Sequence, residues 1–282
     1  MIVNALRKDK AIPSIRSGHN YQERLTIIGT NCAEWGLPRV REMTVKDCEY
    51  YLERRKEEVG QSTLDMERIA LQLTLAHVSG HLEKDERLER VSSLLDEAQG
   101  SRFYTTEQID MVKARMSEAH QLNVDIAHAC GLRAADLLAI NRIDEKAPDD
   151  RPANAEKFLG RPGEGYSVDS KGGLTRAISL PLELAQRLEK HRLDEPMKVM
   201  DRGVVYWSNY NVKGGKRFSD AFAAASKRAL GWSRGAHGLR HTYAQERMRE
   251  LARFGLSYTR ALQTVSQEMG HFRPEITKIY LR

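Results

Sequence analysis

The chain has 282 residues, of which 40% are hydrophobic and 30% charged, so it is long enough for two globular domains with packed cores. Its net charge of +6 favours an anionic partner, although an ordinary charged surface fits that value equally well. Three widely spaced cysteines form neither a disulfide framework nor a zinc-binding pattern, and no run approaches the ~18 apolar residues of a membrane helix. We therefore expect a cytoplasmic protein that does not enter a membrane.

The charge is divided unevenly along the chain. Residues 1–100 hold 15 Lys and Arg against 17 Asp and Glu, whereas residues 101–282 hold 30 against 22. The helical pattern breaks between these parts, at Glu97-Ala98-Gln99-Gly100-Ser101. We place a domain boundary there, so the basic excess belongs to the second domain.

Residues 1–100 predict a small helical domain. Residues 1–18 are polar and basic and indicate a loose arm. Helical spacing of apolar residues then recurs in four segments, 20–36, 44–60, 62–80 and 82–95. Thr44 and Asp47 have the spacing of a capping box, and Ser62 or Thr63 can cap the third segment. We expect four or five helices and no strand.

The second domain is expected to begin with two helices. Thr105 and Gln108 have capping-box spacing. Residues 121–130 are apolar on nearly all sides and predict a buried helix that ends at Gly131. Arg133 then begins the next predicted helix, where a cation opposes the helix dipole. This placement indicates a partly buried role for Arg133, and an ordinary surface pair with Asp136 is the alternative.

A β-hairpin is predicted further along. Residues 166–170 and 175–181 alternate between apolar and polar, and Lys171-Gly172-Gly173-Leu174 separates them as a turn. Lys171 therefore lies at the hairpin turn, where a solubilising lysine is the ordinary alternative. The sequence Lys213-Gly214-Gly215-Lys216 is a second glycine turn, but no clear strand pair flanks it.

The remaining elements lead to the most informative stretch. We expect a helix over 182–191, a short strand over 204–207, and a helix that Ser219 caps. A loop over 231–236 then precedes a helix that begins near His237. One more helix ends before Gly270.

Four side chains in this last stretch suit phosphate chemistry. Arg240 offers a planar fork of donors, and His237, three residues earlier, faces the same side of a helical turn. His271 follows a glycine that permits a close backbone approach. Tyr280 is a hydroxyl nucleophile with an ordinary pKa of about 10, so it needs a proton acceptor and a phosphate polarised by cations.

These residues resemble the motifs of the tyrosine recombinases, the phage integrase family. The family pattern is His-x-Leu-Arg-His-x-x-Ala, then Leu-Gly-His, then Thr-x-x-Tyr ending nine residues after that histidine. Here Met269 replaces the leucine, while Thr277 and Tyr280 have the spacing of the family pattern. An upstream motif, Thr-Gly-Leu-Arg-x-x-Glu-Leu, matches with Cys130 in place of Thr and Asp136 in place of Glu.

The resemblance implies a fold and an activity. The fold is mainly α with a small antiparallel β-sheet, and it has two domains: a helical domain that binds core-site DNA (1–100) and a catalytic domain (101–282). The activity is site-specific DNA recombination for a mobile genetic element in the bacterial cytoplasm or nucleoid. The partners are duplex recombination sites and three further copies on DNA, with a monomer or weak oligomer when free. An accessory factor can set direction.

The resemblance also implies a role for each site residue. Arg133 and Arg240 clamp the scissile phosphate, and Tyr280 attacks it to give a 3′-phosphotyrosine. Lys171, the match to the family's hairpin lysine, protonates the leaving 5′-oxygen. The remaining roles are smaller: His237 assists proton transfer, His271 donates a hydrogen bond, and Asp136 orients a neighbouring side chain. No metal, ATP or other cofactor is expected, because the phosphotyrosine link conserves the phosphodiester energy.

Three other functions are alternatives to a recombinase. His237 and His241 have the spacing of zinc ligands, but no Glu follows His237 and Arg240 would bring a cation to the metal. A protein that only binds DNA is disfavoured by the intact Tyr280. A type IB topoisomerase-like enzyme shares the chemistry, and only strand exchange between two sites separates it from a recombinase.

Many relatives carry a segment after the tyrosine that packs on a neighbouring protomer. Here Leu281 and Arg282 alone follow, so we expect this coupling to be made differently or by residues beyond this sequence.

Overall fold

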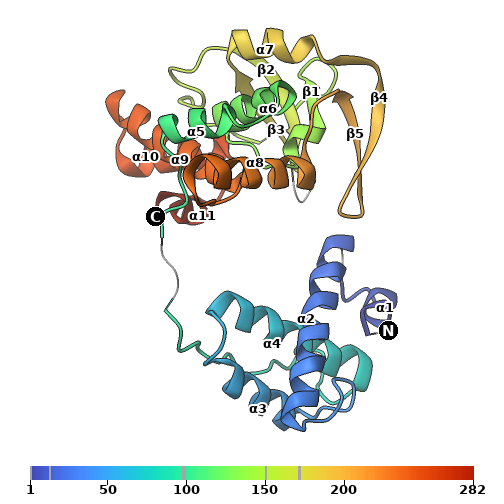
Figure 1. Ribbon diagram of the computed structural model, residues 1–282. Helices are drawn as coiled ribbons and strands as arrows, with labels where there is room; N and C mark the ends of the chain where they lie inside the picture. The colour runs from blue at the N-terminus through green and yellow to red at the C-terminus, as the bar shows by residue number, and fades with distance from the viewer. Residues whose placement is uncertain (1, 13, 97–99, 150, 171–172) are drawn as a thin grey trace. The chain divides into compact units, whose positions relative to one another are not determined.

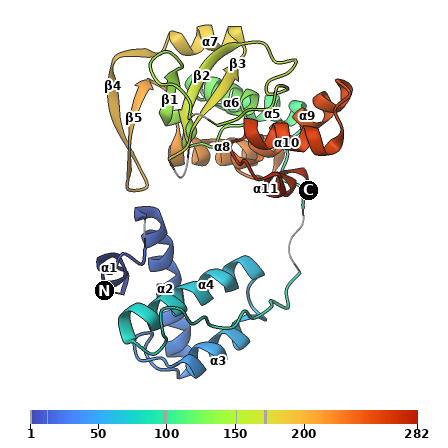
Figure 2. The ribbon, with the colours of Figure 1, turned by 180° about the vertical axis from the view of Figure 1, so that it is seen from behind.

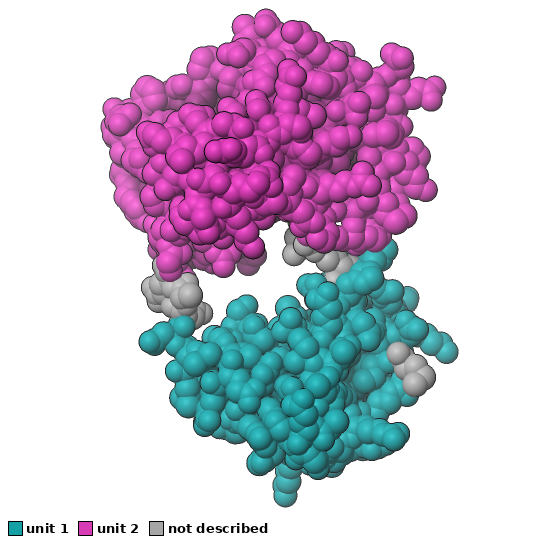
Figure 3. Space-filling model, viewed as in Figure 1, with its two compact units in different colours: residues 1–99 teal, residues 100–282 magenta. Residues whose placement is uncertain are grey.

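A computed structural model describes residues 2–12, 14–96, 100–149, 151–170 and 173–282. The chain divides into two compact units, residues 1–99 and residues 100–282 (Figure 3). The described residues are mainly helical, and small antiparallel sheets occur in the second unit, as the sequence predicts. Within these residues no helix combines the length and apolar character needed to cross a membrane.

The first unit contains four α-helices among its described residues: α1 (Ile2–Lys8), α2 (Ile15–Trp35), α3 (Val45–Arg55) and α4 (Gln61–Thr74) (Figure 1). A π-helical turn, η1 (Leu75–Ser79), extends α4 and ends at Gly80, which has a φ of 72°. The predicted capping box is present, because Thr44 and Asp47 exchange hydrogen bonds at the start of α3. The core of this unit lies between α2, α3 and α4 and includes Ile28, Tyr51 and Leu71.

Three expectations for the first unit are wrong. Residues 1–18 are not a loose arm: Val3 and Leu6 have helical spacing and are buried in α1. The segment 82–95 is not helical, since the carbonyl of Leu88 accepts a hydrogen bond from the Arg68 side chain instead of from a helical neighbour. Neither Ser62 nor Thr63 caps α4, which follows Gly60 without a side-chain cap.

The second unit begins with helices and then forms a three-stranded sheet. The elements up to the sheet are α5 (Thr106–Lys113), α6 (Glu118–Ala129), the 3₁₀ turn η2 (Asp136–Ala139), β1 (Ile140–Arg142), β2 (Glu164–Asp169) and β3 (Thr175–Leu180). The strands are antiparallel in the order β1-β2-β3, with Val168 opposite Arg176. The predicted hairpin is therefore present, and its turn residues Lys171 and Gly172 lie outside the described residues.

The elements after the sheet are α7 (Leu182–Glu189), β4 (Arg192–Asp201), β5 (Val204–Tyr210), α8 (Gly215–Leu230), α9 (His237–Arg253), α10 (Tyr258–Glu268), α11 (Pro274–Lys278) and the 3₁₀ turn η3 (Ile279–Leu281). Strands β4 and β5 form a hairpin on the opposite side of this unit from α10 (Figures 1 and 2). Strand β4 was not predicted, because it is exposed along most of its length and its residues do not alternate between buried and exposed.

The start of α8 differs from the expected one. The helix begins at Gly215 rather than after Ser219. Gly215 has a φ of 62°, and a side chain there would meet the carboxylate of Asp201, which accepts a hydrogen bond from the Lys216 backbone. The Gly214-Gly215 pair therefore starts a helix and does not close a hairpin.

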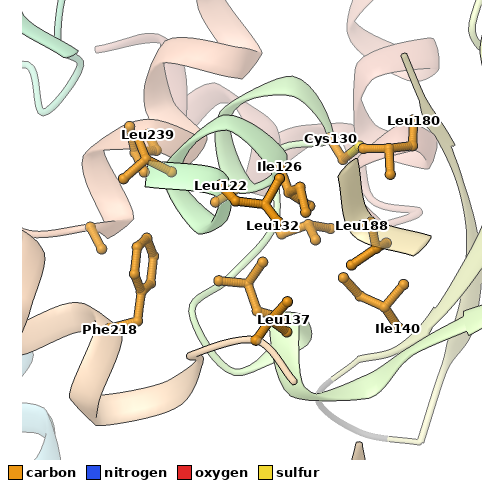
Figure 4. Close-up of a cluster of buried hydrophobic side chains, with 14 of the residues drawn as sticks. Leu122, Ile126, Cys130, Leu132, Leu137, Ile140, Leu180, Leu188, Phe218 and Leu239 are labelled. Carbon is orange, nitrogen blue, oxygen red and sulfur yellow. The ribbon is translucent and has the colours of Figure 1, made fainter. Parts of the chain in front are cut away.

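The core of the second unit surrounds α6, as its apolar composition predicts. Side chains from α6, the sheet, α7, α8 and α9 form one cluster (Figure 4). Leu122 and Ile126 of α6 lie within it, together with Phe218 of α8. A separate cluster joins α9 and α10 to the last residues and contains Tyr243, Val265 and Tyr280. These two cores fix the start of α9 beside the end of the chain.

Candidate active site

Arg240 holds together three segments that are far apart in the sequence. It lies in the first turns of α9 and is completely buried. Its guanidinium donates hydrogen bonds to the carbonyl of Gly131, which follows α6, and to the carbonyl of Met269, which follows α10. It also lies 2.9 Å from Nε2 of His271. Two predicted site residues, Arg240 and His271, are therefore in direct contact.

Tyr280 lies among the rings of this cluster. Its ring centroid is 5.5 Å from that of His237, 4.6 Å from that of His241 and 5.2 Å from that of His271. The Arg240 guanidinium carbon is 5.5 Å from the same centroid. Tyr280 belongs to η3 and is 8% exposed, so packing holds the aromatic ring in place. His271 Nδ1 lies 3.2 Å from the hydroxyl of Thr277, one turn before the tyrosine.

Arg133 lies in the turn between α6 and η2, not at the start of an α-helix as expected. The chain turns here because Gly131 takes a φ of 57° and the Asp136 carboxylate accepts the Arg133 backbone N–H at 3.1 Å. The Arg133 side chain is 27% exposed and its Nη1 is 3.9 Å from that carboxylate. Arg133 is thus both paired with Asp136 and close enough to lower the pKa of His271.

Arg176 is a further residue of the site that was not predicted from the sequence. This residue is on β3, is 2% exposed, and its Nη2 lies 3.5 Å from the Asp136 carboxylate. A signal was present in the sequence, because Arg176 shares one face of the strand with the buried residues Ile178 and Leu180. A cation on the buried face of a strand needs a partner or a task.

Lys171, the predicted general acid, lies outside the described residues. The strands on either side of its turn are described, and β3 carries Arg176 close to Asp136. Lys157 is a described lysine near Arg176. Burial and the charge of Arg176 lower the pKa of Lys157. Lys157 is thus the alternative against which Lys171 has to be tested.

The site has an excess of positive charge. Three arginines, Arg133, Arg176 and Arg240, surround one carboxylate, that of Asp136. Burial and the charges of Arg133 and Arg176 lower the pKa of Arg240 to about 9. Among the described residues, Nε of Arg240 and Nη2 of Arg176 have no hydrogen-bond partner. A buried cluster with unused donors is suited to binding an anion such as a phosphate.

The histidines of the site are held neutral. Burial, followed by the charge of Arg240, lowers the pKa of His271 to about 3. Desolvation and Arg240 likewise lower the pKa of His237 to about 4, although this side chain lies at the solvent-exposed rim. A neutral imidazole can accept a proton, as the predicted role of His237 requires. No group of three potential metal ligands was found among the described residues.

The burial of His241 predicts a pH effect on stability. Burial, followed by the charge of Arg102, lowers the pKa of His241 from 6.5 to about 4, and the ring is 5% exposed. Between these values the unfolded chain binds more protons than the folded chain, so the free energy of unfolding should fall as the pH falls from 6.5 to 4. This single group can account for up to about 3 kcal/mol.

Chemical denaturation at several pH values checks this expectation. His241→Gln should reduce the loss of stability below pH 6.5, because glutamine does not titrate there, and the lowered pKa values of His237 and His271 should keep the rest of the loss. His19→Gln, at an exposed histidine of the first unit, is the control. An equal pH dependence in wild type and His241→Gln would show that His241 is not held neutral by the fold.

No family model matches the sequence, and no curated protein matches it either. Solved structures do match. A lambda integrase dimer bound to a COC′ core site has a TM-score of 0.61 and 16% identity, over 100% of this chain and 76% of that chain. The Tn1549 transposon integrase in complex with transposon right end DNA has a TM-score of 0.59 and 15% identity, over 99% of this chain and 92% of that chain.

A third match is the XerH site-specific recombinase bound to a palindromic difH substrate. It has a TM-score of 0.51 and 16% identity, over 85% of this chain and 67% of that chain. All three are similar to this chain in structure far more than in sequence. The chain therefore has the fold of the tyrosine recombinases, and the resemblance drawn from the motifs agrees with this fold.

Proposed function

We propose that this protein is a site-specific DNA recombinase that breaks and rejoins DNA through a 3′-phosphotyrosine intermediate. One arrangement supports this function. Tyr280 lies beside His271, and His271 lies beside the buried fork of Arg240, so a hydroxyl nucleophile adjoins a cluster with unused cationic donors. Cations fixed in advance stabilise the charge that grows on a phosphate during attack.

Each residue has a role in the proposed reaction. The Tyr280 oxygen forms a bond to phosphorus while the bond to the 5′-oxygen breaks, and the reverse attack by a 5′-hydroxyl rejoins the strand. His237 assists transfer of the proton from Tyr280. Arg133 and Arg240 bind the non-bridging oxygens, to which His271 also donates. Lys171 protonates the leaving 5′-oxygen, and Asp136 orients Arg133.

The wider function follows from the same proposal. The first unit binds core-site DNA and residues 101–282 carry the chemistry. The solved structures of similar fold include a lambda integrase tetramer bound to a Holliday junction, with a TM-score of 0.61 and 16% identity over 99% of this chain. We infer that four copies of this chain likewise exchange strands between two duplex sites, with a monomer or weak oligomer as the free form. Integration or excision of a mobile element in the bacterial cytoplasm, assisted by an accessory factor, is the proposed setting.

A search for its DNA sites tests this function. Purified protein is incubated with duplex fragments that cover the DNA next to its gene, and protein covalently linked to DNA is trapped and sequenced. We expect adducts at one short site with the protein on the 3′-phosphate, and recombinant junctions when two such sites are present. Relaxation of supercoils without junctions would indicate a nicking-closing enzyme, and binding without an adduct would indicate a DNA-binding protein.

The leaving-group proton is expected to come from Lys171. Lys171→Ala should slow single-turnover cleavage about a hundredfold on ordinary DNA, because an alkoxide leaves poorly without an acid. A substrate with sulfur in place of the bridging 5′-oxygen should restore the rate, since a thiolate of pKa about 8.5 leaves without protonation. Rates of adduct formation on the two substrates measure this rescue.

Lys157→Ala is the matched control for this experiment. It removes a lysine whose pKa is lowered by burial and by the charge of Arg176. We expect Lys157→Ala to cleave both substrates at nearly the wild-type rate. If instead only Lys157→Ala is slow on ordinary DNA and rescued by sulfur, Lys157 is the acid and Lys171 is a surface lysine.

A further inference from the structure

Arg176 contacts segments that carry two different predicted site residues. Its Nη2 lies 3.5 Å from the Asp136 carboxylate, and Asp136 in turn accepts the backbone N–H of Arg133 at 3.1 Å. Its Nη1 donates to the main-chain carbonyl of Glu268, which lies three residues before His271. Within its own hairpin, Nε lies 3.3 Å from the Ser170 hydroxyl. One guanidinium thus connects the Arg133 turn, the β2–β3 hairpin and the end of α10.

The turn that carries His271 is packed directly against Arg176. A side chain at Gly270 would lie 2.6 Å from Cδ of Arg176, and Gly270 has a φ of 73°. The glycine therefore lets the chain turn sharply while touching the aliphatic part of the arginine. The position of His271 depends on where this arginine lies.

The end of α10 is also held by a buried carboxylate with several hydrogen-bond partners. The carboxylate of Glu268 is fully buried and accepts hydrogen bonds from Arg247 at 2.8 and 2.9 Å and from the Tyr243 hydroxyl at 2.8 Å. A buried ionic network with satisfied partners resists displacement. The Arg133 turn is held by two arginines: Arg240 donates to the Gly131 carbonyl before the turn, and Arg176 pairs with Asp136 after it.

We propose that Arg176 is a positioning residue that sets Arg133, through Asp136, and His271, through the Glu268 carbonyl, at the spacing that one phosphate requires. The inference rests on the proposed recombinase function. Arg176 uses Nη1 and Nε in hydrogen bonds with the Glu268 carbonyl and the Ser170 hydroxyl, and its Nη2 forms an ion pair with Asp136 at 3.5 Å that is longer than a hydrogen bond. A shift of about 1 Å in a group that binds the reacting phosphate can slow a reaction a hundredfold.

Arg176→Gln and Arg176→Lys test this role. Single-turnover cleavage is measured on the duplex at which the wild-type adduct maps, together with the Kd for that duplex and the melting temperature. We expect both variants to cleave ten- to a hundredfold more slowly with Kd changed less than threefold. Lysine should not restore the rate, because it keeps the charge but cannot reach Asp136 and the Glu268 carbonyl together. If Arg176→Gln fails to fold, Arg176→Lys carries the same test.

Arg187→Gln is the matched control. Arg187 is bonded at 3.0 Å to Asp125, so this variant loses an equal charge from an ion pair elsewhere in the second unit. A double variant, Arg176→Gln with Asp136→Asn, should lose less cleavage rate than the product of the two single losses, since the two residues share the contact between them. Three outcomes would overturn the positioning role: single-variant losses of rate that multiply in the double variant, a wild-type rate in Arg176→Gln, or a wild-type rate in Arg176→Lys.

A measurement on the free protein separates this inference from the proposed function. The NMR resonances of the His271 imidazole should shift in Arg176→Gln and also in Arg176→Lys, which keeps the charge, and stay in place in Arg187→Gln, whether or not the protein cleaves DNA. A shift without any wild-type adduct would leave the positioning role standing and refute the recombinase proposal. Unchanged His271 resonances in Arg176→Gln would refute the positioning role alone.

Discussion

Tyr280→Phe should abolish covalent attachment to DNA while leaving DNA binding unchanged. The change removes only the hydroxyl oxygen that would attack the phosphate, and the ring that packs between the histidines stays. The measurement uses a duplex with a nick beside the cleavage site, so that the released fragment diffuses away and the adduct accumulates. Wild type should become trapped on the 3′-phosphate, and peptide mapping should place the adduct at Tyr280.

Tyr258→Phe is the control for this experiment. Tyr258 is the first residue of α10 and is 60% exposed, which makes it accessible to DNA without being part of the site. This variant should form the adduct as wild type does. A full yield of adduct from Tyr280→Phe, or an adduct mapped to another residue, would refute the assignment of Tyr280.

Arg240→Lys should slow cleavage on the order of 100- to 1,000-fold, although it conserves charge. The guanidinium donates at once to the Gly131 carbonyl and the Met269 carbonyl and lies beside His271, and an ammonium group cannot span these positions. The magnitude is that of removing one preorganised donor from a transition state. Single-turnover adduct formation at saturating protein measures it.

Arg161→Lys provides the comparison. Arg161 forms a two-point contact with Glu250, at 2.8 and 2.7 Å, so its replacement also removes a planar fork from the second unit. This variant should cleave within a fewfold of wild type. Cleavage by Arg240→Lys at the rate of Arg161→Lys would mean that Arg240 only supports the fold.

Elements with strong local signals were predicted correctly from the sequence. The capping boxes at Thr44 and Thr105 and the β2–β3 hairpin are where the residues indicated. The incorrect predictions concern segments whose secondary structure is decided by tertiary contacts. α1 forms because Val3 and Leu6 have a core to pack against, and β4 pairs with β5 despite an exposed, irregular sequence.

The candidate site was predicted in part for the same reason. Motif spacing can indicate that Arg240 and His271 belong together, and the structure places them in contact. It cannot indicate which side chains support them from other segments. The position of Arg176 beside Asp136 and the contact between His241 and Tyr280 both result from long-range packing. Only the place of Arg176 on the buried face of β3 indicated its role from the sequence.

The hydrogen bonds of Arg240 to main-chain carbonyls bear on which sequence changes the site can tolerate. A carbonyl is supplied by any amino acid, so position 269 can hold methionine in place of the expected leucine and still bind the guanidinium. Position 131 has no such freedom. A side chain there would come within 2.6 Å of the Tyr243 ring at a φ of 57°, so even alanine would displace the carbonyl that Arg240 needs. Two positions that perform the same task therefore differ in the variation they permit, and backbone conformation rather than chemistry makes the difference.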